Sequence, residues 1–223
     1  MNSAGPAGYA RAVPSRYGVV DASLFAAFGA GEGLAADATG VPASGELPSD
    51  AQVIALARED PAQALDVIYK AYRGRIYSFL LRFLGDPELA ADVVQDAFTK
   101  TYRALPTLTR EHKVLPWLYR IASNTAIDHV RRRKRIAWVR LGAIANTSAE
   151  PGEDGHADDV GERDHVQAVL RMLPPENAMA LLLHAVEGYS YKEIAEIQSC
   201  TLTAVRSRIA RAREAFRKGY ATK

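Results

Sequence analysis

Residues 116–135 read PWLYRIASNTAIDHVRRRKR, and the rest of the chain is organised around them. Pro116 suits the first position of a helix, where a missing N–H costs no hydrogen bond. At about 100° per residue, one narrow stripe of this helix collects Trp117, Arg120, Asn124, Asp128 and Arg131. A different arc is apolar enough to be buried, and it collects Leu115, Leu118, Ala122, Thr125 and Ala126. We therefore predict a helix with one packed side and one exposed side.

The exposed side combines an aromatic ring, an amide and cations, and the stretch ends in five consecutive basic residues, 131–135. This mixture suits single-stranded nucleic acid, because cations follow phosphates, rings stack on bases and an amide reads a base edge. A solvated amphipathic helix with a basic end would show the same pattern. The stretch alone does not decide between the two interpretations.

The length of 223 residues allows one domain or two small ones. No apolar run approaches the roughly 20 residues that a membrane span needs, and no signal peptide is evident. Cys200 is the single cysteine, which excludes an internal disulfide and a cysteine-rich zinc site. We expect a cytoplasmic protein without membrane insertion, metal or cofactor.

The net charge of +2 conceals an alternation along the chain. Residues 1–49 carry −2, residues 50–137 carry +5, residues 138–163 carry −4 and residues 164–223 carry +3. Two basic segments separated by an acidic one are typical of two modules that face one polyanion. Residues 1–49, rich in Ala, Gly and Pro, are expected to be a disordered extension, and residues 138–163 a flexible acidic linker.

Capping residues predict the helices around the opening stretch. Ser49 or Asp50 can cap a short helix, Asp60 a long helix that ends at Gly85, and Asp86 a helix over residues 87–104. Apolar residues of the long helix recur at spacings of three and four, which is typical of a helical bundle. In the helix over 87–104, an acidic and polar outer stripe contains Asp92, Gln95, Asp96 and Thr99. A charged stripe of this kind is usually solvated.

The C-terminal segment predicts a helix-turn-helix. Ser190 and Glu193 form a capping box for a helix over residues 191–197, and Thr201 can cap a last helix after a tight turn. The last helix is basic, and its first part would enter a major groove, where Arg206 can pair with guanine. Other candidate DNA contacts on this helix are Thr203, Ser207, Ala210, Arg211 and Arg213. A capped helical hairpin with a basic surface is the alternative.

Three stretches together resemble the extracytoplasmic-function (ECF) sigma factors of bacterial RNA polymerase, group 4 of the sigma-70 family. Residues 174–217 resemble the C-terminal domain of that family through LPP, EG-S-EIA and SR–RAR elements. Residues 87–103 resemble its polymerase-binding helix, and residues 117–135 its WLYRIA-N-A-D–RR promoter-melting helix. The resemblance spans about residues 50–220 and implies an all-α protein with two small helical domains: a sigma-2-like bundle (50–137) and a sigma-4-like helix-turn-helix domain (164–223).

The resemblance also implies roles and partners. The polymerase-binding positions, which grip the coiled coil of the largest subunit, are Asp92, Gln95, Asp96 and Phe98. The positions that would line or capture the −10 non-template strand are Trp117, Tyr119, Arg120, Asn124, Asp128, Arg131, Arg132 and Arg133. The C-terminal domain would dock on the polymerase flap and read the −35 duplex, and an anti-sigma factor is a further expected partner. The acidic linker would thread toward the RNA exit path.

The turn before the last helix departs from the family pattern, because Gln198-Ser199 stands where Leu-Gly is usual. Ser199 would cost roughly 1 kcal/mol if that position needs a positive φ. Two other functions stay open at this point. One is a two-domain helix-turn-helix regulator that acts without replacing sigma. The other is an enzyme with a DNA-binding tail, which the scattered histidines and the lack of a recognisable nucleophile disfavour; we expect no enzymatic activity.

Overall fold

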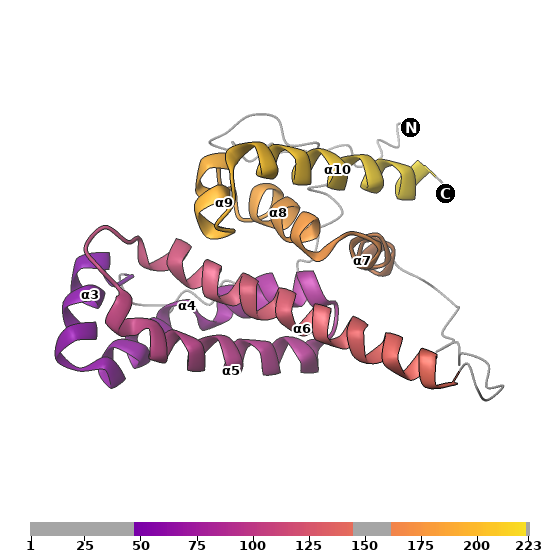
Figure 1. Cartoon of the computed structure of the whole chain (residues 1–223). Coiled ribbons are helices and arrows are strands. Elements are labelled where there is room, and N and C mark those ends of the chain that lie inside the picture. The colour runs from indigo at the N-terminus through magenta and orange to yellow at the C-terminus, as the bar shows by residue number, and fades with distance from the viewer. Residues whose placement is uncertain (1–46, 145–161, 222–223) are drawn as a thin grey trace, which may run out of the picture.

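The computed structural model describes residues 47–144 and 162–221, and these two ranges form helices joined by short connections (Figure 1). The prediction of an all-α fold is confirmed. The extension expected at residues 1–49 lies outside the described residues up to position 46, and so do residues 145–161 of the expected linker.

The N-terminal module consists of α3 (Asp50–Glu59), α4 (Pro61–Leu84), α5 (Pro87–Ala104), a short 3₁₀ helix η1 (Leu105–Thr107) and α6 (Val114–Ile144). Its first three helices begin as the local sequence predicts. Ser49 forms a capping box with Gln52, Asp60 accepts hydrogen bonds from the N–H groups of the first turn of α4, and Asp86 caps α5. Gly85 ends α4 in the left-handed region at φ 68°.

The boundaries of α6 differ from the prediction at both ends. The helix begins at Val114, so Pro116 is its third residue rather than its first. A proline is tolerated there because the first four N–H groups of a helix have no partner within it. The cap comes from far away in the sequence, since Asp50 Oδ1 accepts the N–H of Val114 at 3.1 Å. At its other end α6 runs to Ile144, so residues 138–144 of the expected linker are helical.

The C-terminal module consists of α7 (Glu162–Met172), α8 (Pro175–Ala185), α9 (Tyr191–Ile197) and α10 (Leu202–Ala221). The predicted capping box of α9 is present, with Ser190 and Glu193 as its two members. Figure 1 shows α8 and α9 lying between α10 and the N-terminal module. Helices α8 and α9 contact α6, and α7 and α8 contact α4.

One apolar core runs through both modules. On the N-terminal side, Ile68, Ile76 and Phe79 of α4 are fully buried at the spacings that the sequence predicts. On the C-terminal side, α8 buries Met179 and residues 181–183, and α10 buries Val205, Ile209, Ala212 and Phe216, which recur at helical spacing. Among the helices that the structure describes, none is both long and apolar enough to cross a bilayer.

Candidate nucleic-acid interface

The exposed side of α6 carries most of its predicted residues. Arg120, Asn124, Asp128 and Arg131 are exposed along one side, and the basic run continues exposed through Arg135. Leu118, Ala122 and Ala126 are fully buried on the opposite side. The predicted division of α6 into a packed and a solvent-facing side is therefore confirmed for these positions.

The two aromatic residues of this stretch are not on the surface. Trp117 is 8% exposed and Tyr119 is fully buried, so the prediction of an exposed aromatic ring on α6 is wrong for this structure. The physical reason is that α6 is covered from two directions. The ring of Tyr119 packs edge-on against Phe79 of α4, with centroids 4.9 Å apart, and against Tyr189 of the C-terminal module, with centroids 5.4 Å apart.

The hydroxyl of Tyr119 is the centre of a polar cluster that joins the modules. It donates a hydrogen bond to Oε2 of Glu187, which follows α8. It accepts one from Nε of Arg75 in α4 at 3.0 Å, while Nε and Nη2 of Arg75 both lie 3.2 Å from the same Glu187 oxygen. The side chain of Glu187 is only 7% exposed, and Arg75 and Tyr119 supply the polar partners that a buried carboxylate needs.

The pKa values of this cluster follow from burial and from the ion pair. Burial, reinforced by the carboxylate of Glu187, raises the pKa of Tyr119 far above its ordinary value, so the hydroxyl stays a donor. Burial also raises the pKa of Tyr189. Burial alone would lower the pKa of Arg75, but Tyr119 and Glu187 outweigh it and the pKa is raised. The sequence did not indicate Arg75 or Glu187 as site residues, since they meet Tyr119 only through the packing of the modules.

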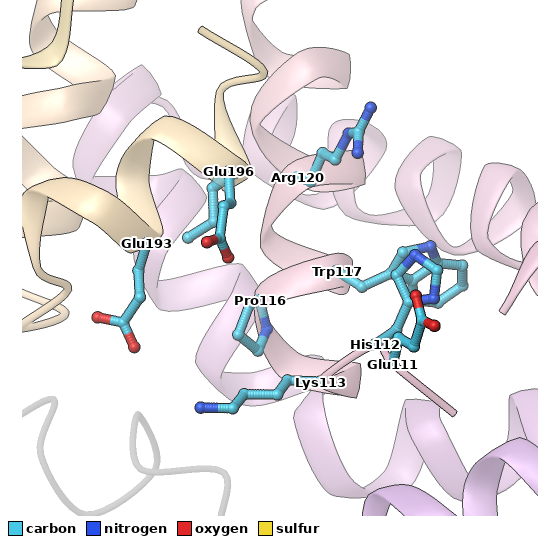
Figure 2. Close-up of a pocket in the computed structure, with 9 residues that line it drawn as sticks. Glu111, His112, Lys113, Pro116, Trp117, Arg120, Glu193 and Glu196 are labelled. Atoms are coloured by element: carbon cyan, nitrogen blue, oxygen red, sulfur yellow. The ribbon is translucent and has the colours of Figure 1, made fainter. Parts of the chain in front are cut away.

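A pocket of about 200 Å³ opens beside the start of α6 (Figure 2). Its lining residues come from the loop before α6, from α6 itself and from α9: Glu111, His112, Lys113, Pro116, Trp117, Arg120, Glu193, Glu196 and Ile197. Figure 2 shows Glu193 and Glu196 on the α9 side, across the pocket from the α6 residues. Hydrogen bonds with Ser190 lower the pKa of the Glu193 carboxylate, and the cation of Lys113 lowers it further.

The outer stripe of α5 is the predicted polymerase-docking surface. Asp92, Gln95 and Asp96 are exposed on it, as predicted, and Asp96 Oδ2 lies 2.9 Å from Nε2 of His129 in α6. Phe98 is 4% exposed, so it belongs to the core rather than to the surface. The ring of Tyr69, 39% exposed, packs edge-on against Phe98 and takes its place as the aromatic group beside this stripe.

The predicted groove-reading residues lie on the outer side of α10. Thr203, Arg206, Ala210 and Arg211 are exposed, while Ser207 and Arg213 are partly buried. Thr201 caps the helix through its hydroxyl, which accepts the N–H of Ala204 at 3.2 Å.

The unusual turn before α10 has a structural explanation. Ser199 adopts φ 49°, so the left-handed conformation that the family's glycine would allow is present here. The N–H groups of Ser199 and Cys200 donate to the carbonyls of Glu196 and Ala195, which closes a Schellman motif at the end of α9.

Gln198, the other unusual residue of the turn, holds it through hydrogen bonds to α8 and to α10. Its Nε2 donates to the carbonyl of Glu176 at 3.1 Å. Its Oε1 accepts from Nη1 of Arg208 at 2.6 Å, and the same guanidinium lies 3.3 Å from the sulfur of Cys200. The sequence did not indicate Arg208 as a site residue, and its contacts connect the turn to α10.

The basic end of α6 and helix α10 meet at a second pocket of about 330 Å³, lined by Arg131, Glu176, Asn177, Ala204, Ser207, Arg208 and Arg211. Glu176 lies in the first turn of α8 and forms an ion pair with Arg131. The resemblance implies that the basic end of α6 and the outer side of α10 contact different parts of a promoter. In this structure both line one pocket, in which Glu176 pairs with Arg131. In the part of the chain that the structure describes, no group of three or more potential metal ligands comes together.

Comparison with known proteins covers both modules. Residues 68–136 match the family model described as sigma-70 region 2, and residues 163–216 match sigma-70 region 4. The RNA polymerase sigma-H factor of Pseudomonas aeruginosa is 34% identical over 183 residues, which cover 76% of this chain and 92% of that protein. The ECF RNA polymerase sigma-E factor of Escherichia coli strain K12 is 33% identical over 182 residues, with 77% and 94% covered.

Two solved structures share the fold. The sigma factor RpoE of Bartonella quintana, solved with the anti-sigma factor NepR, has a TM-score of 0.53 at 23% identity and covers 73% of this chain and 98% of its own. CnrH, solved with the cytosolic domain of CnrY, has a TM-score of 0.56 at 22% identity and covers 79% and 99%. At these identities the similarity concerns the fold alone.

Proposed function

This chain belongs to the extracytoplasmic-function sigma factors of the sigma-70 family, and we propose that it directs RNA polymerase core to specific promoters and starts DNA melting there. One observation carries the assignment of surfaces. Each of the three family-like segments, in α5, α6 and α10, is a helix with a buried apolar side and an exposed polar side. The protein acts in this proposal by binding, in the cytoplasm where the polymerase works, and not as an enzyme.

The −35 element is the proposed ligand of α10. Arg206 is exposed near the start of the helix, where a side chain can reach the edge of a guanine in the major groove. Thr203, Ser207 and Ala210 would approach neighbouring bases or phosphates, and the later arginines would contact the duplex backbone. Phosphate contacts supply affinity and the few base contacts supply specificity.

The −10 non-template strand is the proposed ligand of α6. Asn124 is the candidate reader of an unstacked base, with Arg120 and Asp128 one turn away on either side. Arg131, Arg132 and Arg133 would hold phosphates at the fork. Flipping a base out of the stack costs a few kcal/mol, which contacts near Asn124 would have to offset. Trp117 and Tyr119 are buried, so neither ring belongs to this surface in the conformation described, and Tyr119 is held by Tyr189 and Glu187 of the C-terminal module.

Core polymerase is the proposed partner of α5. Asp92, Gln95 and Asp96 present carboxylates and an amide to the coiled coil of the largest subunit, with Tyr69 as the adjacent aromatic group. The C-terminal module would meet the flap. We further propose that residues 50–137 and 164–223 act as the two domains, that the acidic segment 138–163 lies along the RNA exit path, and that an anti-sigma factor restrains the protein.

Run-off transcription with purified core on a promoter library tests the function, together with co-elution of the protein and core in gel filtration. Asp96→Lys should abolish co-elution without unfolding the protein, because it reverses a charge in the docking stripe. Asp66→Lys makes the same change on the exposed side of α4 and should leave co-elution intact. If the wild-type chain binds promoter duplex tightly alone and never binds core, the sigma-factor proposal fails and a helix-turn-helix regulator is indicated.

Permanganate reactivity of unpaired thymines tests the role of Asn124. Asn124→Ala should reduce strand opening more than it reduces closed binding to the duplex, because the amide would contact only an unpaired base. Equal losses in both measurements would show that Asn124 does not capture a base.

A further inference from the structure

The turn between α9 and α10 carries polar side chains that tie three elements of the C-terminal module together. We propose that Gln198 and Arg208 are positioning residues, which hold α10 at the angle that base recognition needs. With Cys200, which both elements adjoin, they are termed the turn clamp. The proposal rests on the −35 role proposed above for α10, and it gives Arg208 a role other than contact with DNA.

Gln198 joins the turn to α8. Its Nε2 donates a hydrogen bond to the main-chain carbonyl of Glu176 at 3.1 Å. Glu176 lies in the first turn of α8, and residues 181–183 of that helix are fully buried in the core. The side-chain amide of Gln198 therefore anchors the turn to a firmly packed helix.

Arg208 joins the turn to α10. Its Nη1 donates to Oε1 of Gln198 at 2.6 Å and lies 3.3 Å from the sulfur of Cys200. Nη1 carries two N–H groups, so this one nitrogen can serve both acceptors. Hydrogen bonds from a guanidinium are stronger than those between neutral groups, and all three side chains are partly buried, where water competes less.

The direction of its side chain separates Arg208 from the candidate base contact Arg206. Two residues along an α-helix correspond to a rotation of about 200°, so the two arginines point to nearly opposite sides of α10. Arg206 is exposed, whereas Arg208 is partly buried against the turn. When Arg206 approaches a base edge, Arg208 is therefore directed back toward the turn.

Base recognition depends on the angle at which α10 is held. Val205, Ile209 and Ala212 pack on one side of the helix, and apolar packing is not directional. A contact that reads a base has to be held to within about 0.5 Å and 10–20°. The hydrogen bonds of the turn clamp are directional, and they act within the first two turns of α10, where Arg206 lies.

Hydrogen exchange on the free full chain tests the turn clamp itself. The peptide over residues 195–203 contains the N–H groups that close the turn at the end of α9. Gln198→Ala and Arg208→Ala should each speed exchange of this peptide about tenfold, because each breaks the bond between the amide and the guanidinium. Arg58→Ala removes the same charge from an exposed position of α3 and serves as the matched control. Unchanged exchange in both variants, with circular dichroism showing them folded, would overturn the proposal.

Duplex binding by the holoenzyme tests what the turn clamp does. The probe is a short duplex with the −35 element of the strongest promoter in the library, compared with duplexes in which single G·C pairs are exchanged for A·T. Arg208→Ala should reduce the discrimination between these duplexes about fivefold, because base contacts tolerate little displacement. The slope of log affinity against log salt should not change, since no phosphate contact is lost. Gln198→Ala should have the same two effects, although it removes no charge.

Two further variants separate positioning from phosphate binding. Arg208→Lys keeps the charge without the planar guanidinium, so it should behave like Arg208→Ala. Gln198→Ala combined with Arg208→Ala should be no worse than either change alone, because both remove the same bond. A phosphate contact at Arg208 would instead lower the salt slope by about 1, leave the base preference unchanged and let Arg208→Lys restore affinity. That result would overturn the proposal.

The wild-type holoenzyme separates this proposal from the proposed function. If it discriminates among the duplexes and the variants do so equally well, the turn clamp is refuted and the proposed function stands. If no form of the chain makes core discriminate among them, the −35 role of α10 is refuted, and the positioning role of Gln198 and Arg208 is refuted with it.

Discussion

Replacing Ser199 by glycine should stabilise the protein. Ser199 has φ 49°, in the left-handed region, and among the described non-glycine residues no other has a positive φ. Its place in the Schellman motif at the end of α9 requires that conformation, because the N–H groups of Ser199 and Cys200 reach back to the carbonyls of Glu196 and Ala195. The side chain is exposed, so its removal opens no cavity.

The size of the effect is a difference of two terms. The left-handed conformation costs a residue with a Cβ roughly 1–2 kcal/mol, and glycine removes that cost. Glycine also makes the unfolded chain more flexible, which takes back roughly 0.5–1 kcal/mol. The net gain in the free energy of unfolding should be about 0.5–1 kcal/mol. For a chain of this size, that corresponds to a rise of about 1–4 °C in the thermal midpoint.

Thermal unfolding followed by circular dichroism measures the effect, with two comparisons. Ser199→Ala keeps the strained conformation without the hydroxyl and should leave the midpoint nearly unchanged. Gly188→Ala is the reverse experiment, because Gly188 has φ 75° and an added Cβ would meet nothing within 4 Å. It should lower the free energy of unfolding by about 1 kcal/mol. If Ser199→Gly lowers the midpoint while Gly188→Ala behaves as expected, the left-handed conformation is not what limits the stability of this turn.

Three further predictions concern caps and the reading helix. Ser190→Ala should cost about 0.5–2 kcal/mol in urea unfolding at pH 7. The folded pKa of Glu193 is lowered from 4.5, so this loss of unfolding free energy should have its full size above pH 4.5 and shrink as the pH falls below it. A loss that grows in acid would contradict the capping box. Asp50→Ala should cost about 1–2 kcal/mol in the same assay, since it uncaps α6 and loses a first-turn acid in α3; an unchanged midpoint would show that water caps α6 equally well. Arg206→Ala should weaken binding of the holoenzyme to a −35 duplex by about 1–3 kcal/mol and relax its sequence preference, whereas Arg217→Ala should leave that preference unchanged; an unchanged preference in Arg206→Ala would point to phosphate contact only.

Local sequence signals predicted the helices well because their causes are local. The cap residues Ser49, Asp60, Asp86 and Ser190 all hydrogen-bond to backbone groups within three residues, and the apolar spacings follow directly from helix geometry. The start of α6 was mispredicted because its cap, Asp50, is distant in the sequence. A proline near a helix start is a weaker signal than such a cap.

The site was predicted where exposure depends on one helix and mispredicted where it depends on a neighbour. Asn124 and Arg120 are exposed, as their spacing along a single helix predicts. Tyr119 is buried because Arg75 and Glu187 close over it, and helical periodicity carries no information about a second module. Phe98 is buried on the inner side of α5, where the periodicity of its own helix places it, and only the resemblance implied a docking role for it.

Because α6 is one unbroken helix, it both packs in the core and fixes the spacing of the exposed residues along it. The same unbroken helix that packs Leu118 and Ala126 carries Arg120 near one end of the exposed side and Arg135 near the other. Fifteen residues at 1.5 Å each separate the two arginines by about 22 Å along the helix axis. In the proposal that α6 binds the −10 strand, this length bounds the stretch of strand that the two arginines can contact together. Because α6 is one continuous helix, inserting one residue into it would turn everything beyond the insertion by about 100° and take the basic run off the side that carries Arg120.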